Sequence, residues 1–247
     1  MTKLKYRMLA SLLLACVVGG SAISLAASKK EKPSGKMVDS GTFGVYINGK
    51  RVASEKFEVT QTSDLSVAKA ELQVGEEKAP QIAELQMSPN GDLIKYQWSE
   101  KDKGTATVQP KDDGFLIEHV ELTQPGKSAE QPFLLPVSTM ILDDYFFSHR
   151  QLLLWRYLAT NCKPKAGEPG CQLQKQQYGV IVPRQQTSAQ VTITYEGNQK
   201  VAIKGVDQLM SRFLMSMDGN DWTVWMDGAY KIQKIAIEAD HAEVYRE

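Results

Sequence analysis

The sequence lacks the short motifs that mark the common catalytic chemistries. It has no GxSxG elbow to present a nucleophilic serine, and neither GxxxxGK[ST] nor GxGxxG to cradle a phosphate group. Histidine is scarce, and His119, His149 and His241 lie far apart in the chain. These absences argue against hydrolases, nucleotide-dependent enzymes and histidine-rich metal sites. We predict a protein that is not an enzyme and that uses no metal or cofactor.

Cysteine is equally scarce, and only Cys162 and Cys171 lie outside the N-terminal apolar segment. Their stretch, NCKPKAGEPGC, does not have the CxxC spacing of redox sites, and no histidine or further cysteine lies nearby to complete a metal site. In an oxidising compartment such a pair forms a disulfide, and closing so short a loop removes about 2 to 3 kcal/mol of chain entropy from the unfolded state. We predict a structural disulfide; two reduced thiols that never meet are the alternative.

The N-terminus has the layout of a secretory signal peptide. Three basic residues precede an apolar run that ends near Ala27, so residues 1–27 are predicted to be the signal and residues 28–40 a flexible linker. The protein is then exported, to the periplasm or the extracellular medium. Two alternatives remain: Leu13–Cys16 loosely resembles a lipobox, and an uncleaved run of this length would anchor the chain in a membrane. We expect membrane contact only through such an N-terminus.

No strong charge of one sign is present. The whole chain carries 29 basic and 29 acidic residues, and removal of Lys3, Lys5 and Arg7 with the signal leaves 26 basic residues against 29 acidic ones. A mildly acidic domain does not compete well for phosphate backbones, so we predict no nucleic-acid partner.

Alternating apolar and polar residues dominate the sequence after Gly41. Phe43, Val45 and Ile47 would share one face of a strand, and the Asn48-Gly49 pair that follows is a strong hairpin signal. Similar short segments follow up to the middle of the chain and again after the cysteine loop. The sequence therefore predicts a single antiparallel β domain over residues 41–247.

One segment in the middle of the chain breaks this pattern. Residues 138–160, STMILDDYFFSHRQLLLWRYLAT, contain no glycine or proline and have apolar side chains around nearly the whole helical circumference. We predict a long helix that is buried on most sides. Asp143 and Asp144 would lie near its start, where acidic side chains favour the helix dipole.

A resemblance to known proteins rests on three stretches: FGVYINGKRVASEKFEV, the apolar helix, and WTVWMDGAYKIQKIAIEADHAEVYR. Together they resemble uncharacterised bacterial secreted and periplasmic proteins and, more distantly, carriers of the lipoprotein-sorting type. The resemblance implies a mainly β fold, in which a large curved antiparallel sheet or open barrel packs around a central helix. It implies no catalytic residues.

One group of residues suggests a binding site. His149 and Arg156 lie seven positions apart, so they share a helical stripe with Tyr145 and Leu152 in apolar surroundings. A buried arginine needs a partner, which would be a carboxylate of the sheet, a backbone carbonyl group or the acidic head of a bound amphiphile.

Two functions follow from these patterns. The first is an envelope protein that binds a lipid or another apolar or amphiphilic small molecule between sheet and helix. The second is a structural or interaction module with a filled core, which presents a sheet edge to another envelope protein. A cavity beside the helix would favour the first function.

Overall fold

Strands dominate the computed structural model, which describes residues 35–75, 78–122, 128–163, 170–171 and 175–247. The predicted signal peptide and most of the predicted linker therefore lie outside the described residues. From Ser34 onwards the chain forms one compact unit.

Fifteen strands follow one another along the described part of the chain. The first eight are 7 to 12 residues long: β1 (Lys36–Ile47), β2 (Lys50–Gln61), β3 (Ser66–Val74), β4 (Gln81–Met87), β5 (Leu93–Glu100), β6 (Gly104–Pro110), β7 (Phe115–Leu122) and β8 (Ser128–Pro136). The others are β9 (Met140–Ile141), β10 (Gln176–Val182), β11 (Thr187–Ile203), β12 (Val206–Met217), β13 (Asn220–Met226), β14 (Ile232–Ile237) and β15 (Ala242–Arg246). Two short 3₁₀ turns, η1 (Pro183–Gln185) and η2 (Glu238–Asp240), lie in this second half.

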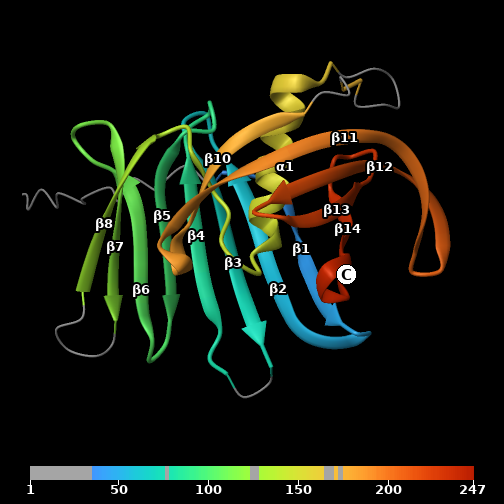
Figure 1. Ribbon diagram of the computed structural model, residues 1–247, viewed down its shortest axis with the longest axis horizontal. Helices are drawn as coiled ribbons and strands as arrows, with labels where there is room; N and C mark the ends of the chain where they lie inside the picture. Colours follow the sequence, from blue (N-terminus) through green and yellow to red (C-terminus); the bar gives the residue numbers. More distant parts are fainter. Residues whose placement is uncertain (1–34, 76–77, 123–127, 164–169, 172–174) are drawn as a thin grey trace, which may run out of the picture. The chain divides into compact units, whose positions relative to one another are not determined.

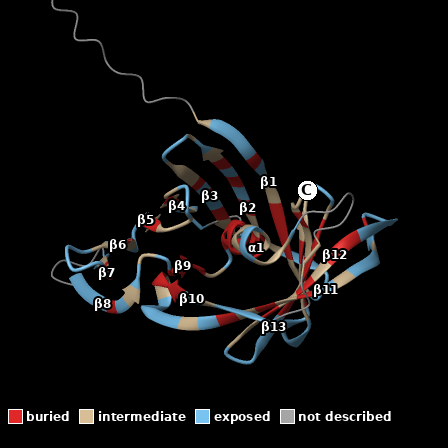
Figure 2. Cartoon of the chain, turned by 90° about the horizontal axis from the view of Figure 1, so that it is seen from above, coloured by how far each residue is buried: buried red, intermediate tan, exposed pale blue. Residues whose placement is uncertain are grey.

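These strands form one sheet in which β1 pairs with β15. The order runs β8-β7-β6-β5-β4-β3-β2-β1-β15-β14-β13-β12-β11-β10-β9, and every pair is antiparallel except β9 with β10. Strands β8 and β9 form the two edges, so the sheet is not closed. In Figure 2 the sheet curves around the single helix α1. The predicted fold class, a large curved antiparallel sheet with one helix, is confirmed.

Local sequence explains how the first hairpin forms. Asn48 and Gly49 both have positive φ, 50° and 75°, as a tight two-residue turn between strands requires. Phe43 and Val45 point into the core, as the alternation predicts. The stretch from Gly44 to Lys50 also matches the first seven positions of the P-loop pattern, but Arg51 follows it and a strand hairpin, not a strand–loop–helix unit, contains it.

Strand β1 begins earlier than predicted. Lys36 pairs with Gln61 of β2, so residues 36–40 are strand, not linker. This part of the prediction was wrong because the segment has polar side chains and no clear alternation. Its one buried side chain is an acid, Asp39, which is only 2% exposed.

The helix is shorter than predicted. Helix α1 spans Phe147–Asn161, so its start lies nine residues after the predicted start at 138. The preceding residues form β9, which pairs in parallel with β10, and a turn in which Tyr145 has φ 63°. Asp143 and Asp144 are therefore not helix-start acids, since the first turn of α1 contains no acidic residue.

Helix α1 is the centre of the core. All eight residues from Phe147 to Leu154 are buried, and Leu153, Leu154 and Tyr157 have no exposed surface. Strands supply the surrounding apolar side chains at alternate positions, such as Leu72 of β3 and Val244 of β15. The predicted burial of the helix is confirmed for its N-terminal half. No helix in the described part of the chain has the length and apolar character needed to cross a bilayer.

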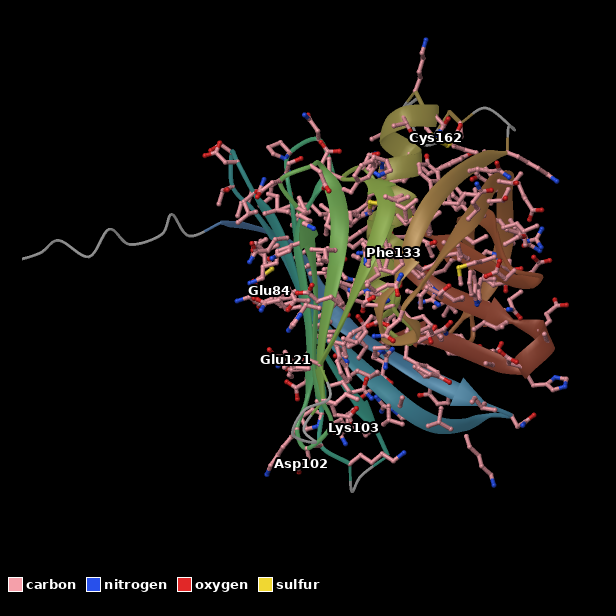
Figure 3. The ribbon with its side chains drawn as sticks, turned by 60° about the vertical axis from the view of Figure 1, so that its left-hand side comes forward. Glu84, Asp102, Lys103, Glu121, Phe133 and Cys162 are labelled. Atoms are coloured by element: carbon pink, nitrogen blue, oxygen red, sulfur yellow. A yellow bond between two sulfur atoms is a disulfide. The ribbon has the colours of Figure 1, made fainter. Side chains whose placement is uncertain are left out.

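A disulfide follows α1 directly. Cys162 and Cys171 are bonded with an S–S distance of 2.04 Å, as predicted, and they pair as an isolated β-bridge. Figure 3 shows Cys162 at the end of α1. The bond ties the end of the helix to the segment that leads into β10.

Candidate functional site

A buried carboxylate holds the start of α1. Glu55 of β2, which has no exposed surface, accepts hydrogen bonds from the backbone N–H of Phe147 at 2.5 Å and of Ser148 at 3.2 Å, and from the Ser148 hydroxyl group at 2.5 Å. Burial raises the pKa of Glu55 to about 7, although these donors favour the ionised form. A strand residue thus satisfies the unpaired N–H groups at the start of the helix.

Arg150, close to the start of α1, is also buried. Its guanidinium lies 5.0 Å from the Phe147 ring centre and 4.9 Å from that of Trp222, and Nη1 donates to the carbonyl of Phe146 at 3.5 Å. Burial lowers its pKa, while nearby acids, among them Glu55, favour the charged form. The two aromatic faces supply much of its surroundings.

A second carboxylate anchors the middle of the helix. The Gln151 amide donates to Asp39 at 2.5 Å, and Lys231 and Arg246 approach the same carboxylate at 2.8 Å and 2.6 Å. Burial alone would raise the pKa of Asp39, but these hydrogen bonds and the Arg246 charge outweigh it and lower the pKa. Gln151 also accepts from the Ile232 N–H at 2.9 Å. Through these contacts Gln151 joins α1 to β1, β14 and β15, which are neighbours in the middle of the sheet.

The third carboxylate, Asp143, precedes the helix. It accepts hydrogen bonds from the Tyr96 hydroxyl group at 2.5 Å and from Arg184 Nε at 2.8 Å. Its backbone N–H donates to His149 Nδ1 at 3.3 Å. Burial raises the pKa of Asp143 and lowers that of His149 to about 3, so His149 is neutral at pH 7.

Glu118 of β7 completes this buried polar cluster. It has no exposed surface, and neither carboxylate oxygen has a hydrogen-bond partner among the described residues. Burial, together with the Asp143 charge, raises its pKa to about 8. Glu118 is therefore protonated at neutral pH.

None of the buried carboxylates Asp39, Glu55, Glu118 and Asp143 lines any of five hollows found on the described residues. Nor do the described His, Cys, Asp and Glu side chains gather in groups of three or more that could hold a metal ion.

The candidate site is a groove beside the C-terminal half of α1, here called the α1 groove. It has a volume of about 350 Å³ and lies where β2 turns into β3 and β4 into β5. Its walls are mainly apolar, and its lining residues are Val38, Val59, Gln61, Ser66, Met87, Pro89, Asn90, Gly91, Met140, Leu152, Trp155, Arg156, Ala159 and Thr160.

The four predicted binding residues separate into two pairs. Leu152 and Arg156 line the α1 groove, whereas His149 and Tyr145 do not. His149 is 1% exposed and packs between the Phe146 and Tyr96 rings, and Tyr145, which precedes the helix, is 48% exposed. The four residues do not form one stripe, because Tyr145 precedes the first residue of the helix and His149 is buried away from the groove.

Arg156 binds backbone carbonyl groups, one of the three kinds of partner predicted for it. Its Nη1 donates to the carbonyl oxygens of Ser138 at 2.7 Å and of Gly91 at 3.2 Å. Trp155 beside it is fixed by an indole N–H bond of 2.6 Å to the Tyr230 carbonyl. Both large side chains are thus held in place at the groove wall.

Sequence reasoning missed the strand side of the groove. Val38, Val59 and Met87 lie on three strands far apart in the chain, and only the pairing of β1, β2, β3 and β4 brings them together. The alternation within each strand indicates an inward side chain, but it does not indicate which inward side chains remain beside an open space.

No protein-family model matches the chain, and neither the curated proteins nor the solved structures contain a significant match.

Proposed function

We propose that this protein is an exported, non-enzymatic binding protein of the cell envelope and that it holds an apolar or amphiphilic molecule in the α1 groove. The groove is the observation that carries the proposal. Its volume of about 350 Å³ and its apolar walls with a few polar groups are typical of small-molecule sites.

Two further features support an exported carrier. The Cys162–Cys171 disulfide is compatible with an oxidising compartment. A helix inside an unclosed curved sheet also agrees with the resemblance to lipoprotein-sorting carriers, which is an analogy of fold only.

A groove-filling substitution tests the proposal. Ala159 is exposed and lines the groove, so Ala159→Trp should occupy the space without disturbing the core. We expect the wild-type protein to bind a fluorescent fatty acid at one saturable site, and the variant to bind it at least about tenfold more weakly, a loss of about 1.4 kcal/mol. Fluorescence titration gives the affinity, and native mass spectrometry gives the stoichiometry.

The control is Ala129→Trp, which adds the same side chain at an exposed position of β8, away from the groove. It should bind the probe as the wild-type protein does. Equal affinity in the Ala159→Trp variant would contradict the proposed site.

The interaction module remains the second candidate function, because β8 forms an open edge of the sheet. Among the described strands β8 pairs only with β7, and Leu134 on it is 81% exposed. Phe133, which directly precedes Leu134 on this strand and is labelled in Figure 3, is buried. A wild-type protein that takes up no probe and purifies without a bound small molecule would favour this function.

A further inference from the structure

We infer that the ligand of the α1 groove is a single-chain amphiphile with an anionic head group and that Arg156 binds this head. The inference rests on the proposed function and adds to it the chemical class of the ligand. It comes from the charge, the free donors and the size of the groove.

Among the described residues that line the groove, Arg156 alone is charged. The other lining residues are apolar, or are neutral polar residues such as Gln61, Ser66 and Asn90. Within the described parts of the chain no carboxylate lies within 4.0 Å of the Arg156 guanidinium. The groove therefore carries one positive charge that has no ionic partner in the described residues.

The hydrogen bonds of Arg156 position this charge without neutralising it. The two carbonyl groups that it contacts, those of Gly91 and Ser138, are neutral, and both bind the same nitrogen, Nη1. The Met140 sulfur also approaches this nitrogen, at 3.3 Å. Three of the five guanidinium donors, on Nε and Nη2, make no hydrogen bond with the described residues. A fork of free N–H groups matches the two oxygens of a carboxylate or phosphate.

Three other arginines that are buried or partly buried have different partners. Arg184 and Arg246 each bind a buried aspartate, at 2.8 Å and 2.6 Å. Arg150 is stacked between two rings in the closed core. Among these arginines only Arg156 combines an open groove with free donors.

The apolar part of the groove accommodates a single chain. Leu152 and Trp155 form its helix wall, and Val38, Val59 and Met87 lie on the strand side. A volume of about 350 Å³ is at the lower end of the range for small-molecule sites, which suits one alkyl chain better than the two of a phospholipid. A chain on this surface leaves its head within reach of Arg156.

The test compares amphiphiles that share one alkyl chain and differ in the head group, together with anions that lack the chain. Dodecanoate and dodecyl phosphate present an anion, dodecanol presents a neutral hydroxyl group, and acetate and inorganic phosphate present the anion without a chain. Each is titrated against the wild-type protein by displacement of a bound fluorescent probe at pH 7.5. We expect each anionic amphiphile to bind at least about tenfold more tightly than dodecanol, since a charge-assisted hydrogen bond increases the affinity by about this factor. The chainless anions should not displace the probe; displacement by either one would identify the site as an anion site and overturn the inference.

Variants locate the head group. Arg156→Met should remove the preference for the anion while leaving the affinity for dodecanol within about twofold, and Arg156→Lys should keep a reduced preference. Arg51→Met, which removes an exposed arginine at the opposite end of β2, is the matched control and should behave as the wild-type protein does. Thermal unfolding of each variant shows whether it is folded, and Arg156→Lys remains informative if Arg156→Met does not fold.

The outcomes separate the two proposals. If neither dodecanoate nor dodecanol binds, the proposed function fails and the head-group inference fails with it. If both bind with equal affinity, or if Arg156→Met keeps the preference for the anion, the groove still binds amphiphiles but the role of Arg156 is overturned.

Discussion

Glu118 shows how far a single side chain departs from what strand alternation predicts. It occupies an inward position of β7 between Leu116 and Val120, where alternation calls for an apolar residue, and it is fully buried without a partner among the described residues. A protonated carboxyl group is the form that such surroundings favour. The residue therefore makes stability depend on pH.

Replacing Glu118 by Gln tests this dependence. Because the folded-state pKa is raised from 4.5 to about 8, the contribution of Glu118 to stability is fully present below about pH 4.5 and is lost as pH rises through 8. Gln does not ionise, so we expect Glu118→Gln to unfold at a urea concentration close to that of the wild-type protein at pH 5. At pH 9 the variant should be more stable than the wild type by about 3 to 5 kcal/mol.

Glu58→Gln provides the control, since Glu58 is an exposed residue of β2. Its difference from the wild-type protein should be the same at both pH values. A Glu118→Gln variant that gains nothing at pH 9 would contradict the buried, protonated state.

Residue roles of this kind were only partly predictable. The sequence indicated that His149 and Arg156 face inward, but Asp39 and Glu55, the partners of the helix, lie about 90 to 110 positions away from it. No local pattern reports such contacts. Arg156 binds backbone carbonyl groups, which were one of the three kinds of partner that chemistry allowed for it.

At the scale of elements, hairpins were predictable and the helix start was not. Turn residues with special backbone angles, such as Asn48-Gly49, mark hairpins locally. The segment before α1 has no breaker, yet Met140 and Ile141 pair with β10, and that partner lies about 40 residues ahead. Tertiary pairing overrode helix propensity there, and a carboxylate from β2 replaced the expected acids of the first turn.

The disulfide links the other end of α1 to the segment before β10. Removing it with Cys162→Ser and Cys171→Ser together should lower the free energy of unfolding by about 2 to 3 kcal/mol, because the loop is then free in the unfolded state. Urea titration of the variant and the wild-type protein measures the change. The affinity of the α1 groove should stay within about twofold, because neither cysteine lines it.

Reduction of the wild-type protein with dithiothreitol is the parallel measurement, and it should produce the same loss of stability in the wild type and none in the double variant. If both proteins unfold at the same urea concentration before reduction, the bond does not stabilise the fold.

At the scale of the molecule, the curved sheet around a helix was predictable from composition and periodicity, but its connection was not. Figure 1 shows strands on both sides of α1. We call β1 to β8 the first arm of the sheet and β9 to β15 the second arm, and the pairing of β1 with β15 joins them. The sequence also does not indicate that β8 and β9 are the edge strands of the sheet. Strand order depends on contacts between segments that share no sequence signal.

The two arms should unfold as one unit, because α1 is anchored to both. Glu55 on β2 and Tyr96 on β5 bind the start of the helix region in one arm, and Trp222 on β13 stacks on Arg150 in the other. Hydrogen–deuterium exchange of the wild-type protein at increasing urea concentration reports the backbone amides of β5 and of β13 separately. We expect the two urea midpoints to coincide within about 0.2 M, as in two-state unfolding. Separated midpoints would show that α1 does not couple the arms, and the helix would then be a lining of one arm only.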